Sequence, residues 1–338
     1  MENPDNSTIS GEARRILLKQ KYQLIRKAGA AKKCLYVHNS FRKNILCYKS
    51  TYGIVSHRCI QMTPVPPNLC THRCLFCWRP QGGDYGSKEA FLAWDAAGRP
   101  ESVFDPPKNV AEGAILAQRR IVSGYKPFVS DHKWEEARRP IHAAISLAGE
   151  PLLYPWMPEL VQEFANRKIS TFLVTNGTNP EGLAKFMDQE IFPTQSYVTL
   201  PAPNSRIYHK VCRPMISNGW EALKQSLKFL GEFPTRTVVR LTVGKKLNMS
   251  EPEQYAKLIE EVRPSFVEVK GVVHVGSAQK RIPRETMPTH SDIKAFSAQI
   301  NETLNYKAVG EKEDSQVLIL SSGKHPPIIP GFEKGSKI

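Results

Sequence analysis

The chain has 338 residues, 41% of them hydrophobic and 23% charged, a composition that excludes an intrinsically disordered protein. No run reaches the roughly 20 apolar residues of a membrane span, and the first residues lack a secretory signal pattern, so we expect a cytoplasmic protein with no membrane partner. Lysine and arginine outnumber aspartate and glutamate by 47 to 32, and the net charge of +15 favours a polyanionic partner, nucleic acid above all, over a basic surface without function.

The N-terminal segment has the pattern of an amphipathic helix. Over residues 14–28, helical spacing places Leu18, Tyr22 and Ile25 on one face, and Gly29 is a plausible stop. We therefore interpret residues 1–56 as a helical extension that precedes the main domain.

From residue 57 onward, short apolar runs alternate with helical patterns, which is typical of successive βα units. Strands are predicted near 58–62, 143–148, 170–175, 196–200, 237–242, 266–270 and 316–320, and helices near 107–122, 156–167, 180–189, 219–231, 252–262 and 291–303. This order predicts an α/β fold, a partial parallel (β/α) barrel over residues 57–322, with an irregular tail over 323–338. Residues 79–108 are predicted to form a long functional loop.

Three cysteines, Cys70, Cys74 and Cys77, follow the first predicted barrel strand. Clustered thiolates in a reducing compartment favour iron–sulfur or zinc binding over disulfides. A structural zinc site needs four closed ligands, but the sequence has no second Cys-x2-Cys pair, and His72 would need difficult loop geometry to serve as the fourth ligand. The lone Cys212 is expected to be structural.

The Cys-x3-Cys-x2-Cys spacing resembles the signature loop of the radical S-adenosylmethionine (SAM) superfamily. That resemblance implies a [4Fe–4S] cluster with one iron left open for SAM, and places Phe76 near the adenine. Gly149-Glu150 resembles the superfamily's Gly-Gly-Glu motif, with Ala148 in place of the first glycine, and implies a site for the SAM amino group. Thr175 and Asn176, after the third predicted barrel strand, are candidate contacts to the SAM ribose; as isolated residues they would be turn or cap formers.

A second cysteine set, Cys34, Cys47 and Cys59, precedes the signature loop. Taken alone, these residues are also compatible with buried cysteines that pack as small hydrophobic side chains. The run CYKSTYGIVSHRCIQMTP, followed by CTHRCLFCWRP, SLAGEPLLYP and LVTNG, closely resembles the 4-demethylwyosine synthase family in its archaeal single-domain form.

This second resemblance implies a radical SAM enzyme of the wybutosine pathway. Members of that family convert N1-methylguanosine at position 37 of phenylalanine tRNA to tricyclic 4-demethylwyosine, with pyruvate as the two-carbon donor. For this chain it implies a second [4Fe–4S] cluster on Cys34, Cys47 and Cys59, and a Schiff-base lysine at Lys49. The open iron of the second cluster is the alternative site for pyruvate. Without a flavodoxin-like domain, the electron is expected from an external donor such as flavodoxin or ferredoxin.

Two rival functions stay open at this level. A radical SAM RNA methylase or methylthiolase would share the first cluster but not need pyruvate, and a non-catalytic iron–sulfur or zinc RNA-binding module would not cleave SAM. Several further side chains have two interpretations each: Trp78 and Arg79 contact substrate or pack the loop, and Lys32, Lys33, Arg42 and Lys43 bind tRNA phosphates or are simply solvated.

Overall fold

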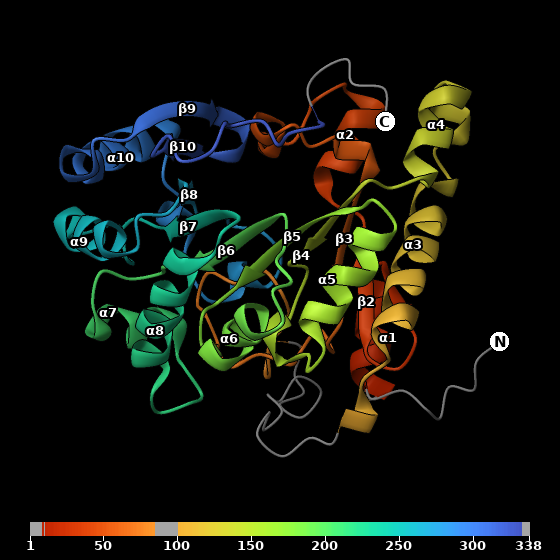
Figure 1. Ribbon diagram of the computed structural model, residues 1–338, viewed down its shortest axis with the longest axis horizontal. Helices are drawn as coiled ribbons and strands as arrows, with labels where there is room; N and C mark the ends of the chain where they lie inside the picture. The colour runs from red at the N-terminus through yellow and green to blue at the C-terminus, as the bar shows by residue number, and fades with distance from the viewer. Residues whose placement is uncertain (1–8, 10, 85–100, 333–338) are drawn as a thin grey trace.

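The computed structural model describes residues 9, 11–84 and 101–332 of the chain. In these residues a ten-stranded sheet is surrounded by helices (Figure 1). The strands are β1 (Tyr22–Ile25), β2 (Gly29–Lys32), β3 (Cys59–Thr63), β4 (His142–Ile145), β5 (Ser170–Thr175), β6 (Gln195–Thr199), β7 (Arg236–Val243), β8 (Phe266–Gly271), β9 (Lys307–Lys312) and β10 (Val317–Ser321). The α-helices are α1 (Gly11–Lys19), α2 (Leu35–Arg42), α3 (Pro107–Ser123), α4 (Asp131–Arg138), α5 (Met157–Asn166), α6 (Pro180–Asp188), α7 (Ser205–Cys212), α8 (Gly219–Glu232), α9 (Pro252–Val262) and α10 (His290–Leu304).

The strands β3 to β8 pair in parallel and in chain order. Antiparallel strands extend the sheet at both edges, β2 and β1 beyond β3, and β10 and β9 beyond β8. Helices α3, α5, α6, α8 and α9 lie around the outside of this sheet (Figure 1). The fold therefore confirms the prediction of an α/β protein with a partial parallel barrel, and each predicted strand and helix is present within a few residues of its expected position. The strand predicted near 316–320 is β10, which pairs antiparallel with β8 and so is not one of the parallel strands.

The interior of the barrel is filled by aromatic side chains from the strands and from a short 3₁₀ helix, Tyr48–Tyr52. Phe172 of β5, Tyr197 of β6 and Phe266 of β8 are fully buried there, in one cluster with Tyr48 and Tyr52. The alternation of strand side chains explains this, because every second residue points inward. The 3₁₀ helix that follows Cys47 therefore packs inside the barrel.

The predicted helix over residues 14–28 is wrong in its second half. Helix α1 ends at Lys19, and the chain continues as the antiparallel hairpin of β1 and β2. Lys21 and Arg26 adopt left-handed backbone conformations, with φ of 64° and 50°, which break the helix and turn the chain. Tyr22 and Ile25 are buried, but as strand residues, whereas Leu18, the third residue of the predicted apolar face, is 46% exposed. The extension is therefore only partly helical.

The remaining expectations concern loops and the tail. Residues 85–100 of the predicted functional loop lie outside the described residues, and helix α3 begins at Pro107. Residues 323–332 contain no helix or strand, which agrees with the predicted irregular tail over its described part. This segment is nevertheless attached to the barrel, because Arg236 donates hydrogen bonds to the carbonyls of Pro326 and Pro327. None of the described helices is long and apolar enough to cross a membrane.

Candidate functional site

The first cysteine set lies on the loop that leaves the C-terminal end of β3. Cys70, Cys74 and Cys77 line one pocket, together with Glu150 and Asn176 from beyond the ends of β4 and β5. Burial raises the pKa of Cys70 and Cys77, while contact with the Cys212 thiol and then burial raise the pKa of Cys74. The structure thus gathers residues from three neighbouring strand ends, as active sites of such barrels require.

Backbone hydrogen bonds hold one side of this loop against the end of α7. The N–H of Arg73 donates to the carbonyl of Cys212, and the N–H of Leu75 donates to the carbonyl of Val211, both at 2.9 Å. Cys212 itself is fully buried in the main core. Its structural role stays a prediction.

Arg281, from the segment after β8, holds the other side of the loop. Its guanidinium donates to the carbonyls of Leu75 at 3.4 Å, of Arg79 at 3.3 Å and of Cys77. It also forms an ion pair with Asp84, and both of these side chains are at most 9% exposed. Sequence reasoning missed this pair, because nothing local connects Asp84 to Arg281.

The carboxylate of Glu150 is buried and accepts three hydrogen bonds. The hydroxyl of Thr175 donates to Oε1 at 2.6 Å, the N–H of Asn176 donates to Oε2 at 2.8 Å, and the N–H of Leu152 donates to Oε1 at 3.1 Å. Burial outweighs these bonds and raises the pKa of Glu150 to about 7. A carboxyl group in this state gains charge stabilisation when a cationic ligand group enters the pocket.

Gly149 joins this carboxyl to the cysteine loop. Its φ is +70°, and a Cβ at this position would lie 2.6 Å from the Leu69 carbonyl and 3.0 Å from the Pro66 carbonyl. The next residue, Glu150, donates its N–H to the Leu69 carbonyl at 2.7 Å. A side chain at position 149 would therefore push the two loops apart, which explains the glycine of the Gly-Glu motif.

The three predicted contacts to the SAM adenosine lie around the same pocket or beside it. Asn176 places its side-chain N–H groups 3.7 Å from the Cys70 thiol and 3.0 Å from the Thr71 hydroxyl. The hydroxyl of Thr175 donates its hydrogen bond to Glu150. Phe76 is partly buried and packs against the apolar cluster that follows β8. Their roles in SAM binding stay predictions.

The second cysteine set comes from three separate elements. Cys34 precedes α2, Cys47 precedes the 3₁₀ helix, and Cys59 begins β3. Burial raises the pKa of Cys47 and of Cys59 to about 12, and the thiols of the set also raise one another. Although 25 residues of chain separate Cys34 from Cys59, the fold brings the three thiols into electrostatic range.

Lys49 lies beside this second set, inside the barrel. The residue is 8% exposed, and its Nζ lies 4.7 Å from the ring centre of Tyr197 and 5.0 Å from that of Phe172. Burial lowers the pKa of Lys49, and the charge of Arg240 lowers it further. Such surroundings favour the free amine, the form that attacks a carbonyl carbon.

A buried ion pair, Arg240 with Glu268, lies within electrostatic range of Lys49. Arg240 donates to one carboxylate oxygen of Glu268 through Nε at 2.9 Å and through a terminal nitrogen at 2.7 Å. Tyr52 donates to the other oxygen at 3.0 Å. Glu268 is fully buried, so this ion pair depends on close geometry to offset its desolvation.

The separation of the thiol sulfur atoms tests whether either cysteine set could hold a single zinc ion. Thiolates on one tetrahedral zinc ion, with bonds of about 2.3 Å, lie about 3.8 Å apart. Among the described residues, the group whose ligand atoms all lie within 4.8 Å is His72, Cys74 and Cys212. Neither three-cysteine set is that compact, and His72 is bound to the Tyr208 hydroxyl at 2.6 Å. A single zinc ion is therefore not favoured at either three-cysteine set, and cluster binding by Cys34, Cys47 and Cys59 stays a prediction.

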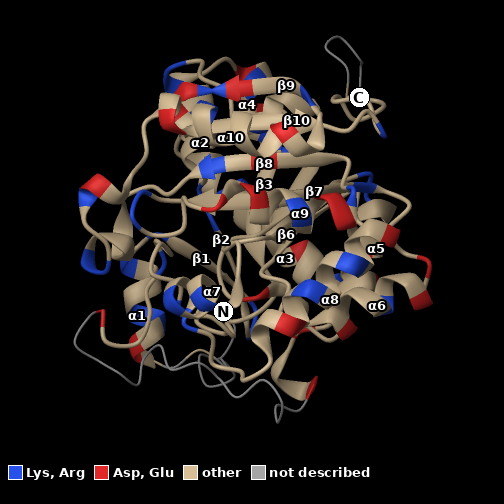
Figure 2. Cartoon of the chain, turned by 90° about the vertical axis from the view of Figure 1, so that its left-hand side faces the viewer, with Lys and Arg blue, Asp and Glu red and all other residues tan. Residues whose placement is uncertain are grey.

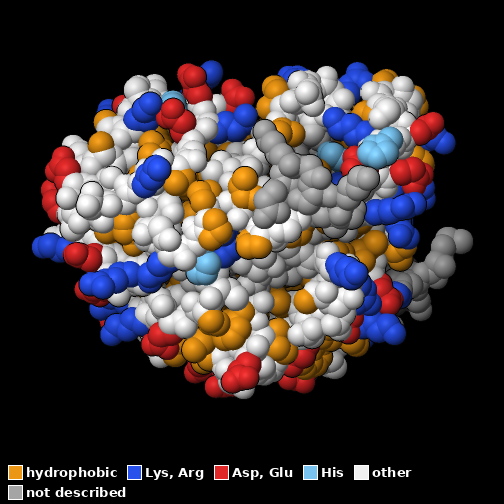
Figure 3. Space-filling view, turned by 45° about the horizontal axis from the view of Figure 1, so that its top comes forward, with side chains coloured by type: hydrophobic (Ala, Val, Ile, Leu, Met, Phe, Trp, Pro, Cys, Tyr) orange, Lys and Arg blue, Asp and Glu red, His pale blue; other side chains and the backbone are white. Residues whose placement is uncertain are grey.

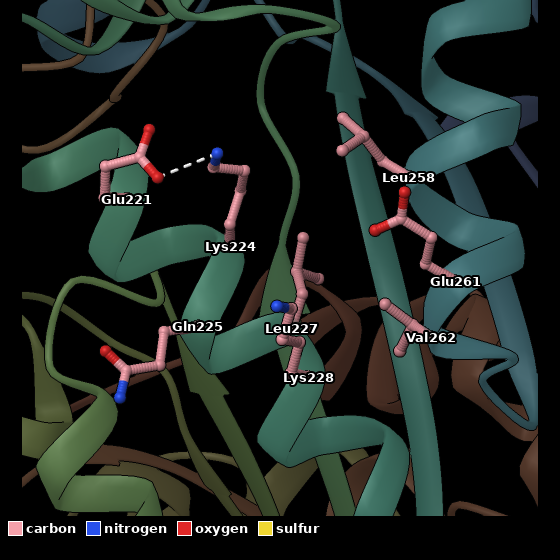
Figure 4. A pocket seen from close by; sticks show the side chains of 8 residues that line it. All are labelled: Glu221, Lys224, Gln225, Leu227, Lys228, Leu258, Glu261 and Val262. Atoms are coloured by element: carbon pink, nitrogen blue, oxygen red, sulfur yellow. Dashed lines mark ion pairs between the residues drawn. The ribbon is translucent and has the colours of Figure 1, made fainter.

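A groove on the outside of the barrel has no cysteine and no buried titratable group among its lining residues. It runs between α8 and α9 and is lined by Glu221, Lys224, Gln225, Leu227, Lys228, Leu258, Glu261 and Val262 (Figure 4). Glu221 and Lys224 pair with each other at 2.8 Å across one helical turn. Without a cysteine or a buried titratable group, this groove is not the candidate site.

Charged side chains of both signs are spread over the outer helices (Figure 2), and the face in Figure 3 likewise mixes lysine and arginine with aspartate and glutamate. Three of the predicted phosphate contacts are engaged within the chain, and the Nζ of Lys32 lies 4.4 Å from the Tyr22 ring centre. Lys33 donates to the Tyr125 hydroxyl at 2.8 Å, and the guanidinium of Arg42 lies 4.2 Å from the Phe128 ring centre. The tRNA-contacting residues stay predictions.

Known sequences similar to this chain cover the whole of the barrel. The sequence model of the radical SAM superfamily matches residues 65–259, and that of wyosine base formation matches residues 261–322. The chain is 43% identical to the SAM-dependent tRNA 4-demethylwyosine synthase of Pyrococcus abyssi, over 93% of this chain and 90% of that protein. It is 42% identical to the protein of the same name from Pyrococcus horikoshii, over 97% and 94% of the two chains.

Solved structures show the same similarity in three dimensions. A structure of TYW1 with a lysine–pyruvate adduct bound is 32% identical, with a TM-score of 0.81 over 95% of this chain and 99% of that one. A crystal structure of archaeal TYW1 is 30% identical, with a TM-score of 0.73 over 95% of this chain and all of that chain.

Proposed function

Because the chain belongs to the radical SAM family of tRNA 4-demethylwyosine synthases, we propose that it converts N1-methylguanosine-37 of phenylalanine tRNA to 4-demethylwyosine, with pyruvate as the two-carbon donor. The observation that carries this proposal is the pairing of two three-cysteine sets in one barrel, with a buried lysine beside the second. A similar protein holds a lysine–pyruvate adduct.

In this proposal Cys70, Cys74 and Cys77 hold a [4Fe–4S] cluster. When bound and reduced by an external donor such as flavodoxin or ferredoxin, that cluster supplies the electron that cleaves SAM to methionine and a 5′-deoxyadenosyl radical. Glu150 receives the amino group of SAM, since its buried carboxyl gains from a cationic partner. Phe76, Thr175 and Asn176 bind the adenosine portion, and Cys34, Cys47 and Cys59 hold a second [4Fe–4S] cluster.

Lys49 acts on the second substrate. Its amine attacks the carbonyl carbon of pyruvate and, with loss of water, forms an imine that positions the acid in the barrel. The 5′-deoxyadenosyl radical takes hydrogen from the N1-methyl group of the guanosine, and the resulting methylene radical adds to the bound pyruvate. The bond between the first and second carbons of pyruvate then breaks, and the carboxyl carbon leaves as a carbon dioxide radical anion, which passes its electron to the external electron carrier and departs as carbon dioxide. The exocyclic amine of the guanosine replaces the Lys49 amine at the imine carbon, which closes the third ring and frees Lys49.

The overall reaction is tested with anaerobically reconstituted protein, methylated tRNA, SAM and pyruvate, followed by mass analysis of the nucleosides. Pyruvate labelled with carbon-13 at its second and third carbons should add two mass units to the tricyclic product. A modified base that forms equally well without pyruvate would support the RNA methylase or methylthiolase instead. Absence of SAM cleavage in the reduced protein would favour a non-catalytic RNA-binding module.

The role of Lys49 is tested separately by borohydride trapping with pyruvate alone. We expect a stable adduct that peptide mapping places on Lys49 and that Lys49→Arg abolishes, while tRNA affinity stays nearly constant because phosphate contacts set it. The exposed Lys108 provides the control, and Lys108→Arg should trap pyruvate normally. An active Lys49→Arg enzyme without adduct would place pyruvate on the second cluster.

A further inference from the structure

Lys270 is a second enclosed lysine in the barrel, and the proposed reaction does not yet use it. It stands near the end of β8, and its Nζ donates to the Ser315 carbonyl at 2.7 Å. The same Nζ lies 5.1 Å from the ring centre of Tyr48, the residue directly before Lys49. Lys270 therefore lies beside the short 3₁₀ helix, Tyr48–Tyr52, that carries Lys49.

Electrostatic neighbours show that the two lysines share one environment. Both are within range of Arg240, Glu268 and Cys47, and Cys34 is also in range of Lys270 and of Lys49. Burial, followed by the charge of Arg240, lowers the pKa of Lys270 to about 8. The nearby Glu268 carboxylate and the cysteine thiols act in the opposite direction, but burial and Arg240 outweigh them.

The charges of this interior do not balance. With Lys49 as the free amine, Arg240 and Lys270 are the cationic groups here, and, apart from the thiols of the second cysteine set, Glu268 is the acidic group near them among the described residues. Arg240 already engages Glu268 through two nitrogens. Among the described residues, Lys270 has no ion-pair partner, and a backbone carbonyl is the hydrogen-bond acceptor of its amine.

An anion that enters this region would restore the balance. A 2-oxo acid carries its carboxylate on the atom next to the carbonyl carbon, so an imine at Lys49 leaves a negative charge a few ångströms from Nζ. A charge-assisted hydrogen bond from an ammonium group is about twice as strong as a neutral one, and it is strengthened by the low dielectric of an interior.

We propose that Lys270 binds the carboxylate of the 2-oxo acid while Lys49 bonds to its carbonyl carbon. This inference rests on the proposed function. Lys270 thereby selects an acid over a neutral ketone of the same size. It also orients the acid in the barrel, so that the imine carbon has one fixed approach for the radical carbon of the guanosine.

The test compares borohydride trapping of pyruvate with that of hydroxyacetone, a neutral ketone of similar size, on the reconstituted holoenzyme. In Lys270→Met, the pyruvate concentration for half-maximal trapping on Lys49 should rise roughly 10- to 100-fold, the loss expected for a hydrogen bond to a charged group. Trapping of hydroxyacetone should not change. Lys270→Arg keeps the charge and should restore most of the preference for the acid, and Lys108→Met controls for the loss of an exposed lysine charge.

Each outcome decides the inference. An unchanged preference for pyruvate over hydroxyacetone in Lys270→Met would overturn it and leave the Lys49 imine intact. No adduct in the wild-type enzyme would overturn the imine, and the inference with it. If Lys270→Met does not fold, competition against pyruvate trapping is measured on the wild-type enzyme instead. Oxamate, an unreactive carboxylate, should compete with trapping, whereas oxamide, its neutral diamide, should not. Equal competition by the two would also overturn the inference.

Discussion

The two cysteine sets are built in opposite ways. Cys70, Cys74 and Cys77 lie within eight consecutive residues, on a loop that backbone hydrogen bonds hold against the end of α7. Cys34, Cys47 and Cys59 come from three elements and meet only because β3 pairs with β2 and the 3₁₀ helix packs inside the barrel. The first set is therefore a local structure placed on the fold, whereas the second set exists only when the fold is complete.

Removing the first cysteine set should have the largest effect on activity. Replacing Cys70, Cys74 and Cys77 by alanine should abolish SAM cleavage and lower the iron content from about eight to about four per chain, since each [4Fe–4S] cluster holds four irons. Iron analysis and the yield of 5′-deoxyadenosine measure both effects. Zinc in place of iron in anaerobically purified protein would contradict the cluster assignment.

Removing the second set should separate the two activities. The triple alanine variant of Cys34, Cys47 and Cys59 should still cleave SAM, because the first loop keeps all of its own contacts, but it should form no tricyclic base. The two assays are the yield of 5′-deoxyadenosine and nucleoside mass analysis. Normal product formation in this variant would make the second set structural at most.

The second site should also be the more sensitive to long-range packing. Glu268→Gln leaves the charge of Arg240 buried without its partner, which typically costs about 3 to 5 kcal/mol of stability. We expect a clearly lower melting temperature and loss of pyruvate trapping at Lys49. Glu311→Gln is the control: its side chain is 50% exposed where it pairs with His290 and Lys294, so the melting temperature should change little.

The smallest expected effect concerns the contact between the loop and the segment after β8. Arg281→Gln removes the donor to the carbonyls of Leu75 and Cys77, and should slow SAM cleavage by roughly 10-fold through misplacement of the loop. Arg281→Lys should recover part of the rate, because it keeps the ion pair with Asp84. Pyruvate trapping on Lys49 should stay unchanged in both variants. An equal loss of trapping would show that the two sites are not independent.

The sequence predicted the barrel well and the extension poorly, for a physical reason. Barrel strands and helices repeat in long periodic segments, so the pattern of β5 or α9 is visible within a single window of residues. The pattern of Leu18, Tyr22 and Ile25 fits a helical face, but backbone pairing with β2 overrides it, and a Lys21 in the left-handed region ends the helix. Pairing of this kind is a tertiary contact that local periodicity does not contain.

The sequence by itself indicated the chemistry of the first loop, because its Cys-x3-Cys-x2-Cys spacing resembles the radical SAM signature loop, and the sequence model of that superfamily matches this chain. The sequence also ordered the parallel strands and so placed Glu150 and Asn176 at the same end of the barrel. Only the tertiary structure decided what surrounds these groups. Asp84 meets Arg281, and Lys270 comes beside Tyr48, across about 200 residues of chain. Such partners are set by packing and charge in three dimensions, and no spacing in the sequence records them.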